Sequence, residues 1–202
     1  ETRSSYITVL SPPTSAGSVG IFRSGTWALD FNGNFGWDGS DKAFTIGQTG
    51  DIPITGDWNN DGKDEIGIFR SGTWALDFNG NRIWDGGDKA FVIGQAGDVP
   101  VIGDWNGNGN DSVGIYRNGL WGLDYNDNYR WDGSDKAFNL GKAGDKPVTG
   151  DWDASGSDSA GIFRNGLWGV DYNGNFAWDA ADKAFYLGQA GDVPVVGDWD
   201  NS

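Results

Sequence analysis

The stretch GIFRSGTWALD at residues 20–30 returns unchanged at residues 67–77. Two further versions, GIYRNGLWGLD at 114–124 and GIFRNGLWGVD at 161–171, keep the same spacing of glycine, arginine and tryptophan. The four copies start 47 residues apart, so no copy carries an insertion. A fixed period of this size predicts stacked supersecondary units, one for each copy.

Within one repeat, Gly, Asn and Asp separate four short apolar or alternating runs, which in the second copy are 51–58, 66–70, 73–78 and 89–94. Trp74 and Leu76 fall on one face of the third run, and Thr73, Ala75 and Asp77 fall on the other, which is the period of a strand. No apolar run with a helical period is long enough for a helix. We therefore predict an all-β fold, a β-propeller of four 47-residue blades with four strands each. A β-solenoid is the alternative, although its repeats are usually shorter.

The repeat region, residues 15–202, starts in the second strand of the unit and ends on a first strand, at 192–202. We predict that the ring is closed by pairing of this C-terminal strand with the N-terminal blade. The alternative is that the strand completes a neighbouring molecule, which gives an open polymer or an eight-bladed dimer. Residues 1–14 lie outside the repeat and are either a linker or a strand that augments a sheet of another subunit.

Composition narrows the possible functions. The 202 residues include no Cys, Met or His, which excludes disulfides, zinc sites built on Cys or His, and Ser-His-Asp or Cys-His catalytic centres. The net charge of −15 disfavours nucleic acid and anionic lipid as partners and favours metal cations. No apolar run is long enough for membrane insertion. The missing initiator Met favours a processed, secreted chain, so we expect an extracellular or cell-surface location.

The first acidic loop of the repeat follows its first strand and reads DWNNDGKDE at residues 57–65. Its oxygen-bearing residues Asp57, Asn59, Asp61 and Glu65 stand at alternating loop positions, a pattern that converges on a hard cation. Followed by the apolar IGIF at 66–69, this loop resembles the FG-GAP/VCBS repeats of extracellular propellers, such as those of integrin α-chains and microbial surface proteins. The resemblance covers residues 15–202 and implies a Ca²⁺-stabilised propeller for adhesion or display. The pattern decays in later copies, where Ser112 and Ser159 replace the last acid.

The second acidic loop, DFNGNFGWDGSD at residues 30–41, returns at 77–88, 124–135 and 171–182. Oxygen-bearing side chains occupy positions 1, 3, 5, 9 and 12 in every copy, the ligand spacing of an EF-hand-type loop. The predicted metal ligands are Asp30, Asn32, Asn34, Asp38, Asp41, Asp77, Asn79, Asn81, Asp85, Asp88, Asp124, Asn126, Asn128, Asp132, Asp135, Asp171, Asn173, Asn175, Asp179 and Asp182.

One observation weighs against a metal in these second loops, and a structure without metal is the alternative. Position 6 lacks the usual glycine, so we expect the backbone to follow a different path from that of an EF-hand. The alternative for the second loops is a tight polar turn, in which the following lysine offsets some of the repulsion among the three carboxylates. For the first acidic loop the alternative is an Asx-rich turn whose side chains bond to their own backbone.

The sequence favours a non-catalytic, calcium-stabilised extracellular β-propeller that is a surface adhesion or display module, or a repeating subunit of a fibre or surface layer. The alternative is a lectin-like propeller with one carbohydrate site per blade, built on Trp37, Trp84, Trp131 and Trp178. Partners would be surface proteins, glycans, or copies of the chain joined through residues 1–14 or the terminal strand. An enzyme is disfavoured because catalysis needs carboxylates with separated pKa values, whereas similar blades supply similar environments.

Overall fold

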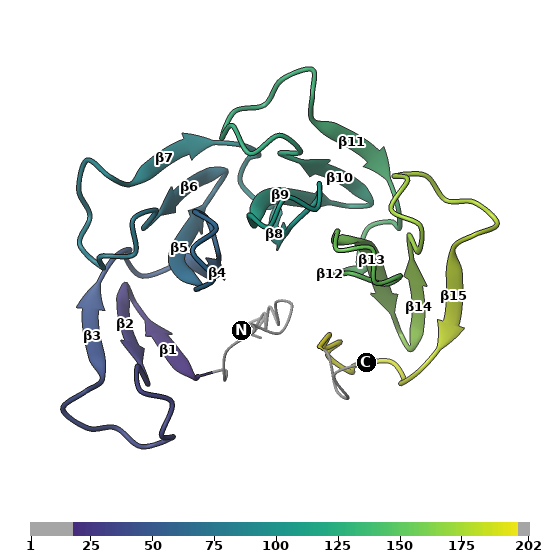
Figure 1. Ribbon diagram of the computed structural model, residues 1–202. Coiled ribbons are helices and arrows are strands. Elements are labelled where there is room, and N and C mark those ends of the chain that lie inside the picture. The colour runs from purple at the N-terminus through teal and green to yellow at the C-terminus, as the bar shows by residue number, and fades with distance from the viewer. Residues whose placement is uncertain (1–17, 198–202) are drawn as a thin grey trace.

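The computed structural model describes residues 18–197, and in this range it contains fifteen β-strands and no helix. The strands form four antiparallel sheets, placed one after another along an arc with their first strands toward its centre (Figure 1). The all-β prediction is confirmed. The described part of the chain offers no helix long and apolar enough to cross a membrane. Predictions for residues 1–14 lie outside the described residues.

The first sheet has three strands, β1 (Gly20–Arg23), β2 (Thr26–Leu29) and β3 (Lys42–Thr45). The second has four, β4 (Ile52–Gly56), β5 (Glu65–Arg70), β6 (Thr73–Leu76) and β7 (Lys89–Val92). The third contains β8 (Val99–Gly103), β9 (Ser112–Arg117), β10 (Leu120–Leu123) and β11 (Lys136–Asn139). The fourth contains β12 (Lys146–Gly150), β13 (Ser159–Arg164), β14 (Leu167–Val170) and β15 (Lys183–Tyr186). The four runs predicted in the second copy are therefore strands, each near its predicted place.

A tight hairpin turn in each repeat sets the register of the middle strands. In the second sheet, Ser71 and Gly72 both have positive φ, 51° and 92°, as a two-residue type I′ turn requires. The turn places Trp74 of β6 directly opposite Phe69 of β5, with ring centroids 4.8 Å apart. The indole nitrogen of Trp74 donates to the carbonyl of Ile93 at 2.8 Å, so the polar atom of this fully buried side chain is satisfied.

The hydrophobic core lies between neighbouring sheets. The second strand of each following sheet covers the tryptophan of the sheet before it, as in the cluster of Trp27, Ile46, Ile66 and Ile68. The next two interfaces repeat this arrangement with Trp74, Leu76, Val113 and Ile115, and with Trp121, Leu123, Ala160 and Ile162. Neighbouring sheets therefore bury one another's apolar faces.

An arginine–aspartate pair joins the first two strands of each complete sheet. Arg117 of β9 donates from Nε and Nη2 to both carboxylate oxygens of Asp98, at 2.5 and 2.6 Å. The Asp98 side chain is buried, whereas that of Arg117 is one-third exposed. Equivalent two-bond pairs join Arg70 to Asp51 and Arg164 to Asp145. Such planar two-bond pairs add geometric specificity as well as energy.

The predicted closure of the ring within one chain is not formed in the described structure. Residues 192–197 belong to no strand, and β1 pairs only with β2. The segment lies instead against the fourth sheet, where Val196 packs on Val148, Phe163 and Trp168. Figure 1 shows β1 and β15 on opposite sides of an opening in the arc. The four sheets therefore form an open arc and not a closed ring.

Candidate metal centre

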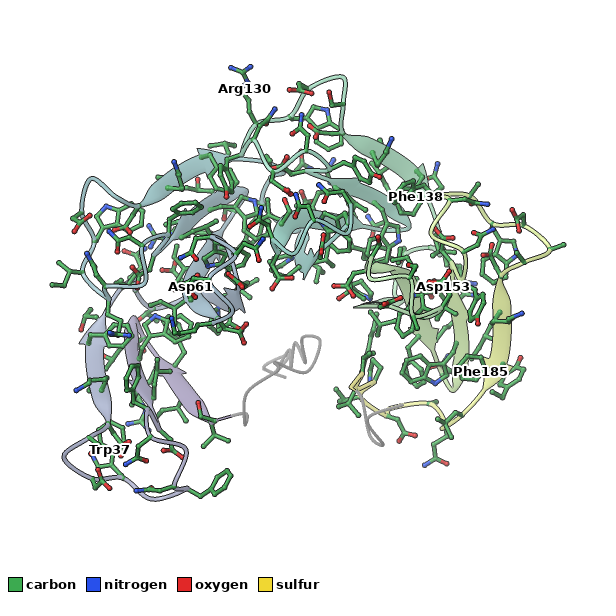
Figure 2. All side chains as sticks on the ribbon, in the orientation of Figure 1. Trp37, Asp61, Arg130, Phe138, Asp153 and Phe185 are labelled. Atoms are coloured by element: carbon green, nitrogen blue, oxygen red, sulfur yellow. The ribbon has the colours of Figure 1, made fainter. Side chains whose placement is uncertain are left out.

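The two kinds of acidic loop lie at different places along each sheet. The first acidic loops join first and second strands (57–64 between β4 and β5, for example), and the second acidic loops join third and fourth strands, as predicted. The second loops project to the outer rim of the arc, where Figure 2 labels Trp37 and Arg130. Asp61 and Asp153, also labelled, belong to first acidic loops of the second and fourth sheets.

Hydrogen bonds within each second acidic loop use most of its side-chain oxygens. In the first sheet, Asp30 accepts the backbone N–H groups of Asn34 at 3.2 Å and Phe35 at 2.8 Å. The Oδ1 atoms of Asn32 and Asn34 accept backbone N–H groups two residues further along, at 3.0 and 2.7 Å. These are Asx turns, in which the side chain takes the place of a backbone acceptor.

The residue at position 6 of the second loops is bulky, yet it adopts the left-handed conformation that favours glycine. The φ angles are 61°, 65°, 60° and 64° at Phe35, Arg82, Tyr129 and Phe176. Each of these residues donates its backbone N–H to the first aspartate of its loop at 2.8–2.9 Å. The left-handed conformation at position 6 therefore forms here without a glycine.

The reason for a large side chain at position 6 is contact with the preceding sheet. The ring of Tyr129 lies 5.3 Å from that of Phe91 and 5.9 Å from that of Phe78, both in the second sheet. Phe176 reaches the third sheet in the same way, with its ring 5.5 Å from that of Phe138. Position 6 therefore joins neighbouring sheets, which a glycine would not do.

Amide groups surround the aspartate at position 9 of the second loops. Asp38 accepts the backbone N–H of Ser40 at 2.7 Å and the Nδ2 atoms of Asn34 and Asn32 at 2.8 and 3.3 Å. The N–H of Ser40, followed by the amide of Asn34, holds the pKa of Asp38 below its usual value. Hydrogen bonds of the same kind lower the pKa values of Asp85, Asp132 and Asp179.

These hydrogen bonds offset the electrostatic repulsion expected among the loop carboxylates without a bound cation. Nitrogen donors of the two asparagines, rather than their oxygens, face the aspartate at position 9. The twenty metal ligands proposed for the second loops remain a prediction, and the geometry favours the hydrogen-bonded alternative.

The first acidic loop of the second sheet has a different polar environment. Asp57 accepts the backbone N–H groups of Asp61 and Gly62 at 3.0 and 2.8 Å. Glu65, at the start of β5, is only 6 % exposed, and its Oε2 atom has no hydrogen-bond partner. The Oδ1 atom of Asn59 is also buried without a partner, while its Nδ2 donates to the carbonyl of Phe78 at 2.9 Å. Burial, reinforced by Asp61 and Asp57, raises the pKa of Glu65 to about 8.

The equivalent loops of the third and fourth sheets provide an internal comparison. There, Ser112 and Ser159 replace Glu65, and their hydroxyls donate to backbone carbonyls at 2.8 and 2.6 Å. Among residues 18–197, buried side-chain oxygens without a partner occur only in the second sheet, at Asn59, Glu65, Asp77 and Asp88. A buried acceptor without a partner is costly and indicates a bound water or ion.

The oxygen atoms available as ligands around Glu65 suit a hard cation. Within the described range, no group of three or more His, Cys, Asp or Glu side chains is arranged to hold a metal ion. A cation beside Glu65 would therefore also need the Asn59 oxygen, backbone carbonyls and water. Calcium accepts this mixture of six to eight oxygen ligands, whereas zinc prefers sulfur and nitrogen.

The four tryptophans assigned to carbohydrate binding are all exposed, by 63 %, 47 %, 47 % and 51 % at Trp37, Trp84, Trp131 and Trp178. The tryptophans of the central strands, such as Trp74 and Trp121, are fully buried. The exposed set therefore presents one aromatic side chain in the second acidic loop of each sheet.

Sequence reasoning missed a contact between neighbouring first acidic loops. Asp111 donates its backbone N–H to the carbonyl of Asp57 at 2.9 Å, and its carboxylate accepts the N–H of Asp57 at 2.9 Å. Asp158 makes the same pair of bonds with Asp104. The signal was present, because Asp64, Asp111 and Asp158 stay constant while the next residue changes from Glu to Ser.

We expect this contact to make stability depend on pH. Burial raises the pKa of Asp111 to about 7, against about 3.9 for an unfolded aspartate. Between these two values the folded state binds the proton more tightly, so the free energy of unfolding falls as the pH rises from about 4 to about 7. Asp111→Asn keeps an acceptor for the N–H of Asp57 but does not titrate. Between pH 4.5 and 8, we expect the unfolding temperature to fall less in Asp111→Asn than in the wild-type protein. Parallel curves of unfolding temperature against pH would contradict the raised pKa of Asp111.

Comparison of the chain with family models, curated proteins and solved structures finds no match. The resemblance to FG-GAP repeats therefore rests on the loop residues alone.

Proposed function

We propose that the chain is a non-catalytic, calcium-stabilised β-propeller module of the cell exterior, used for adhesion or display or as a repeating subunit of an extracellular fibre or surface layer. One observation carries the calcium part of this proposal. The second sheet buries four side-chain oxygens without a hydrogen-bond partner, and two of them belong to the first acidic loop.

The arrangement of the sheets supports the propeller part of the proposal. The first strands β4, β8 and β12 of neighbouring sheets contact one another, as the inner strands of blades do. Residues 192–197 have the sequence of such a first strand, and β1 has an edge without one. We infer that this segment supplies the fourth strand of a first sheet, which turns three strands into a blade.

The calcium site would be centred on Asn59 and Glu65, whose buried oxygens lack partners, with backbone carbonyls and water as further ligands. Asp57 and Asp61, the other predicted ligands of this loop, lie beside it. The ion would supply positive charge beside the buried Glu65, whose carboxylate has Asp61 and Asp57 as neighbours. Its effect would be on stability, because it would join the start of β5 to the loop that precedes it.

Calcium is expected to raise the unfolding temperature of the protein. A ligand present at one hundred times its Kd stabilises the folded state by about 2.7 kcal/mol, which is roughly 5–11 °C for a chain of this length. Glu65→Gln should lose this response, because it removes the charge that the ion would balance. Thermal melts with calcium and with EDTA measure both effects.

Asp153→Asn is the matched control, since it changes the same kind of loop in the fourth sheet and should keep the calcium response. An equal response to calcium in wild-type protein and Glu65→Gln would place the ion elsewhere. An unfolding temperature that does not depend on calcium would remove the metal from the proposal.

The exposed tryptophans favour a second candidate function, carbohydrate binding with one site per sheet. Each lies in a second acidic loop among Asp and Asn side chains, where an aromatic face and polar groups would contact a sugar together. Alanine at Trp37, Trp84, Trp131 and Trp178 together is expected to abolish binding on a glycan array. No binding by the wild-type protein, or unchanged binding by the variant, would remove this candidate.

A further inference from the structure

The first sheet exposes apolar side chains that every later sheet buries. Val19 and Ile21 are 60 % and 55 % exposed. Their counterparts in the later sheets are at most 5 % exposed, because the preceding sheet covers them: Ile66, Ile68, Val113, Ile115, Ala160 and Ile162. Phe35, at position 6 of its loop, is 77 % exposed, whereas Tyr129 and Phe176 pack on the preceding sheet.

The fourth sheet exposes the complementary face. Leu187 is 67 % exposed, whereas its counterparts Ile46, Ile93 and Leu140 are 3–7 % exposed. A cavity of about 570 Å³ opens there, lined by Trp168, Phe185, Leu187 and Val196 among others. Beside it, Tyr172 and Phe185 are the counterparts of the two rings that receive Phe176.

Residues 192–197, which have the sequence of an inner strand, already lie on the fourth sheet. Val196 packs on the cluster around Trp168, just as its counterpart Ile102 of β8 packs on the cluster around Trp74. A three-stranded sheet such as β1–β3 would supply the other three strands of a following sheet. Among residues 18–197 the β1–β3 sheet has no inner strand, and its edge strand β1 pairs on one side only.

The arginine–aspartate pairs show which residues would meet. Asp192 is the counterpart of Asp51, Asp98 and Asp145, and Arg23 is the counterpart of Arg70, Arg117 and Arg164. Within residues 18–197, three pairs of this kind form, but neither Arg23 nor Asp192 takes part in an ion pair. Both side chains are exposed.

We propose that the first sheet of a second copy of this chain docks on the fourth sheet, with residues 192–197 of one copy pairing with β1 of the other. The register of β4 on β5 places Val195 opposite Gly20 and brings Asp192 to Arg23. Apolar contacts like those between neighbouring sheets of one chain are then repeated between copies, and Phe35 takes part in them. The inference rests on the proposed role as a repeating subunit and names its partner.

The first sheet of a second copy fits the exposed face of the fourth sheet better than the chain's own first sheet does. In Figure 1 that sheet stands across the opening from the fourth sheet, with the two complete sheets between them along the arc. Contact between two different faces is heterologous, so it adds further copies head to tail and gives either a ring or an open filament.

Complementary charge reversal tests the proposal. Arg23→Asp and Asp192→Arg each place like charges at the new junction, and both residues are exposed. Asp192→Arg also removes the acceptor of the Gln189 N–H (2.9 Å), so circular dichroism of each variant checks that it folds. We expect the wild-type protein to have at least twice the mass of one chain in concentration-dependent light scattering. Each variant alone should be monomeric, and an equal mixture should associate again, because every junction then pairs opposite charges. A wild-type protein that stays monomeric, or a mixture that stays monomeric, would overturn the proposal.

Cysteine crosslinking gives a second measurement that does not depend on the charges. Ile21 and Pro194 stand opposite each other in the inferred register, and the natural chain has no cysteine. Mixing Ile21→Cys with Pro194→Cys should give a disulfide-linked dimer that neither variant gives alone; without it, the register or the partner is wrong. Both measurements are made with calcium and with EDTA, so that failure to associate is distinguished from failure to bind the cation.

Discussion

Replacing Trp121 with alanine is expected to lower the free energy of unfolding by about 3–5 kcal/mol, the usual cost of deleting a large buried aromatic side chain. Trp121 is fully buried, with ring centroids 5.3 Å from Tyr116 and 6.1 Å from Phe138. Its Nε1 donates to the carbonyl of Leu140 at 3.0 Å, so the change also leaves a buried acceptor without its partner. The cavity would lie between the third and fourth sheets, where Ile162 packs on the same cluster.

Chemical denaturation measured by far-ultraviolet circular dichroism gives this difference. Trp37→Ala is the matched control, because Trp37 is 63 % exposed and its removal should change stability by less than about 1 kcal/mol. Similar losses for the two variants would mean that Trp121 does not occupy the core between these sheets.

Replacing Arg117 with methionine is expected to destabilise the protein by roughly 2–3 kcal/mol. Breaking a fully buried ion pair costs about 3–5 kcal/mol because one charge is left without its partner, and the partial exposure of Arg117 reduces this value. The Asp98 side chain would remain buried, with the N–H of Gln95 at 2.8 Å as one remaining donor.

Arg23→Met is the control offered by the repeat. Arg23 occupies the same position in the first sheet but has no ion pair among the described residues. Under dilute, monomeric conditions, denaturation should show a loss for Arg117→Met and almost none for Arg23→Met. A loss of equal size in both variants would mean that the pair is already formed at Arg23.

The strands and loops of this fold were predictable because the sequence repeats itself. Alternation around Trp74 and Leu76, and the constant Gly within each hairpin turn, predict the same local structure in every copy. Such agreement between local preferences and the whole fold allows the fold to be predicted from the sequence. The placement of the two acidic loops between first and second strands, and between third and fourth strands, followed directly.

Closure of the ring was not predictable in the same way. Residues 192–197 read as a first strand, but their sequence does not say which sheet edge they join. Pairing depends on the curvature of the arc, which is set by packing between sheets at residues such as Tyr129 and Phe176. Strand propensity contains no information about that curvature.

The loops show a second limit of sequence reasoning. Asparagine offers both an oxygen and two N–H donors, so Asn32 and Asn34 have the spacing of metal ligands and equally that of donors to Asp38. Sequence spacing predicted metal ligands in the four second loops as well as in the first loop at Glu65. The unpartnered oxygens of the second sheet are divided between its two loops, at Asn59 and Glu65 and at Asp77 and Asp88, and the buried Glu65 side chain favours the first loop.

Isothermal titration calorimetry with calcium, which counts bound ions per chain, tests most directly whether the chain holds one cation beside Glu65. We predict one calcium ion per chain in the wild-type protein, and none after Glu65→Gln. Four ions per chain would assign binding to the second acidic loops, and no binding at all would contradict the calcium-stabilised module.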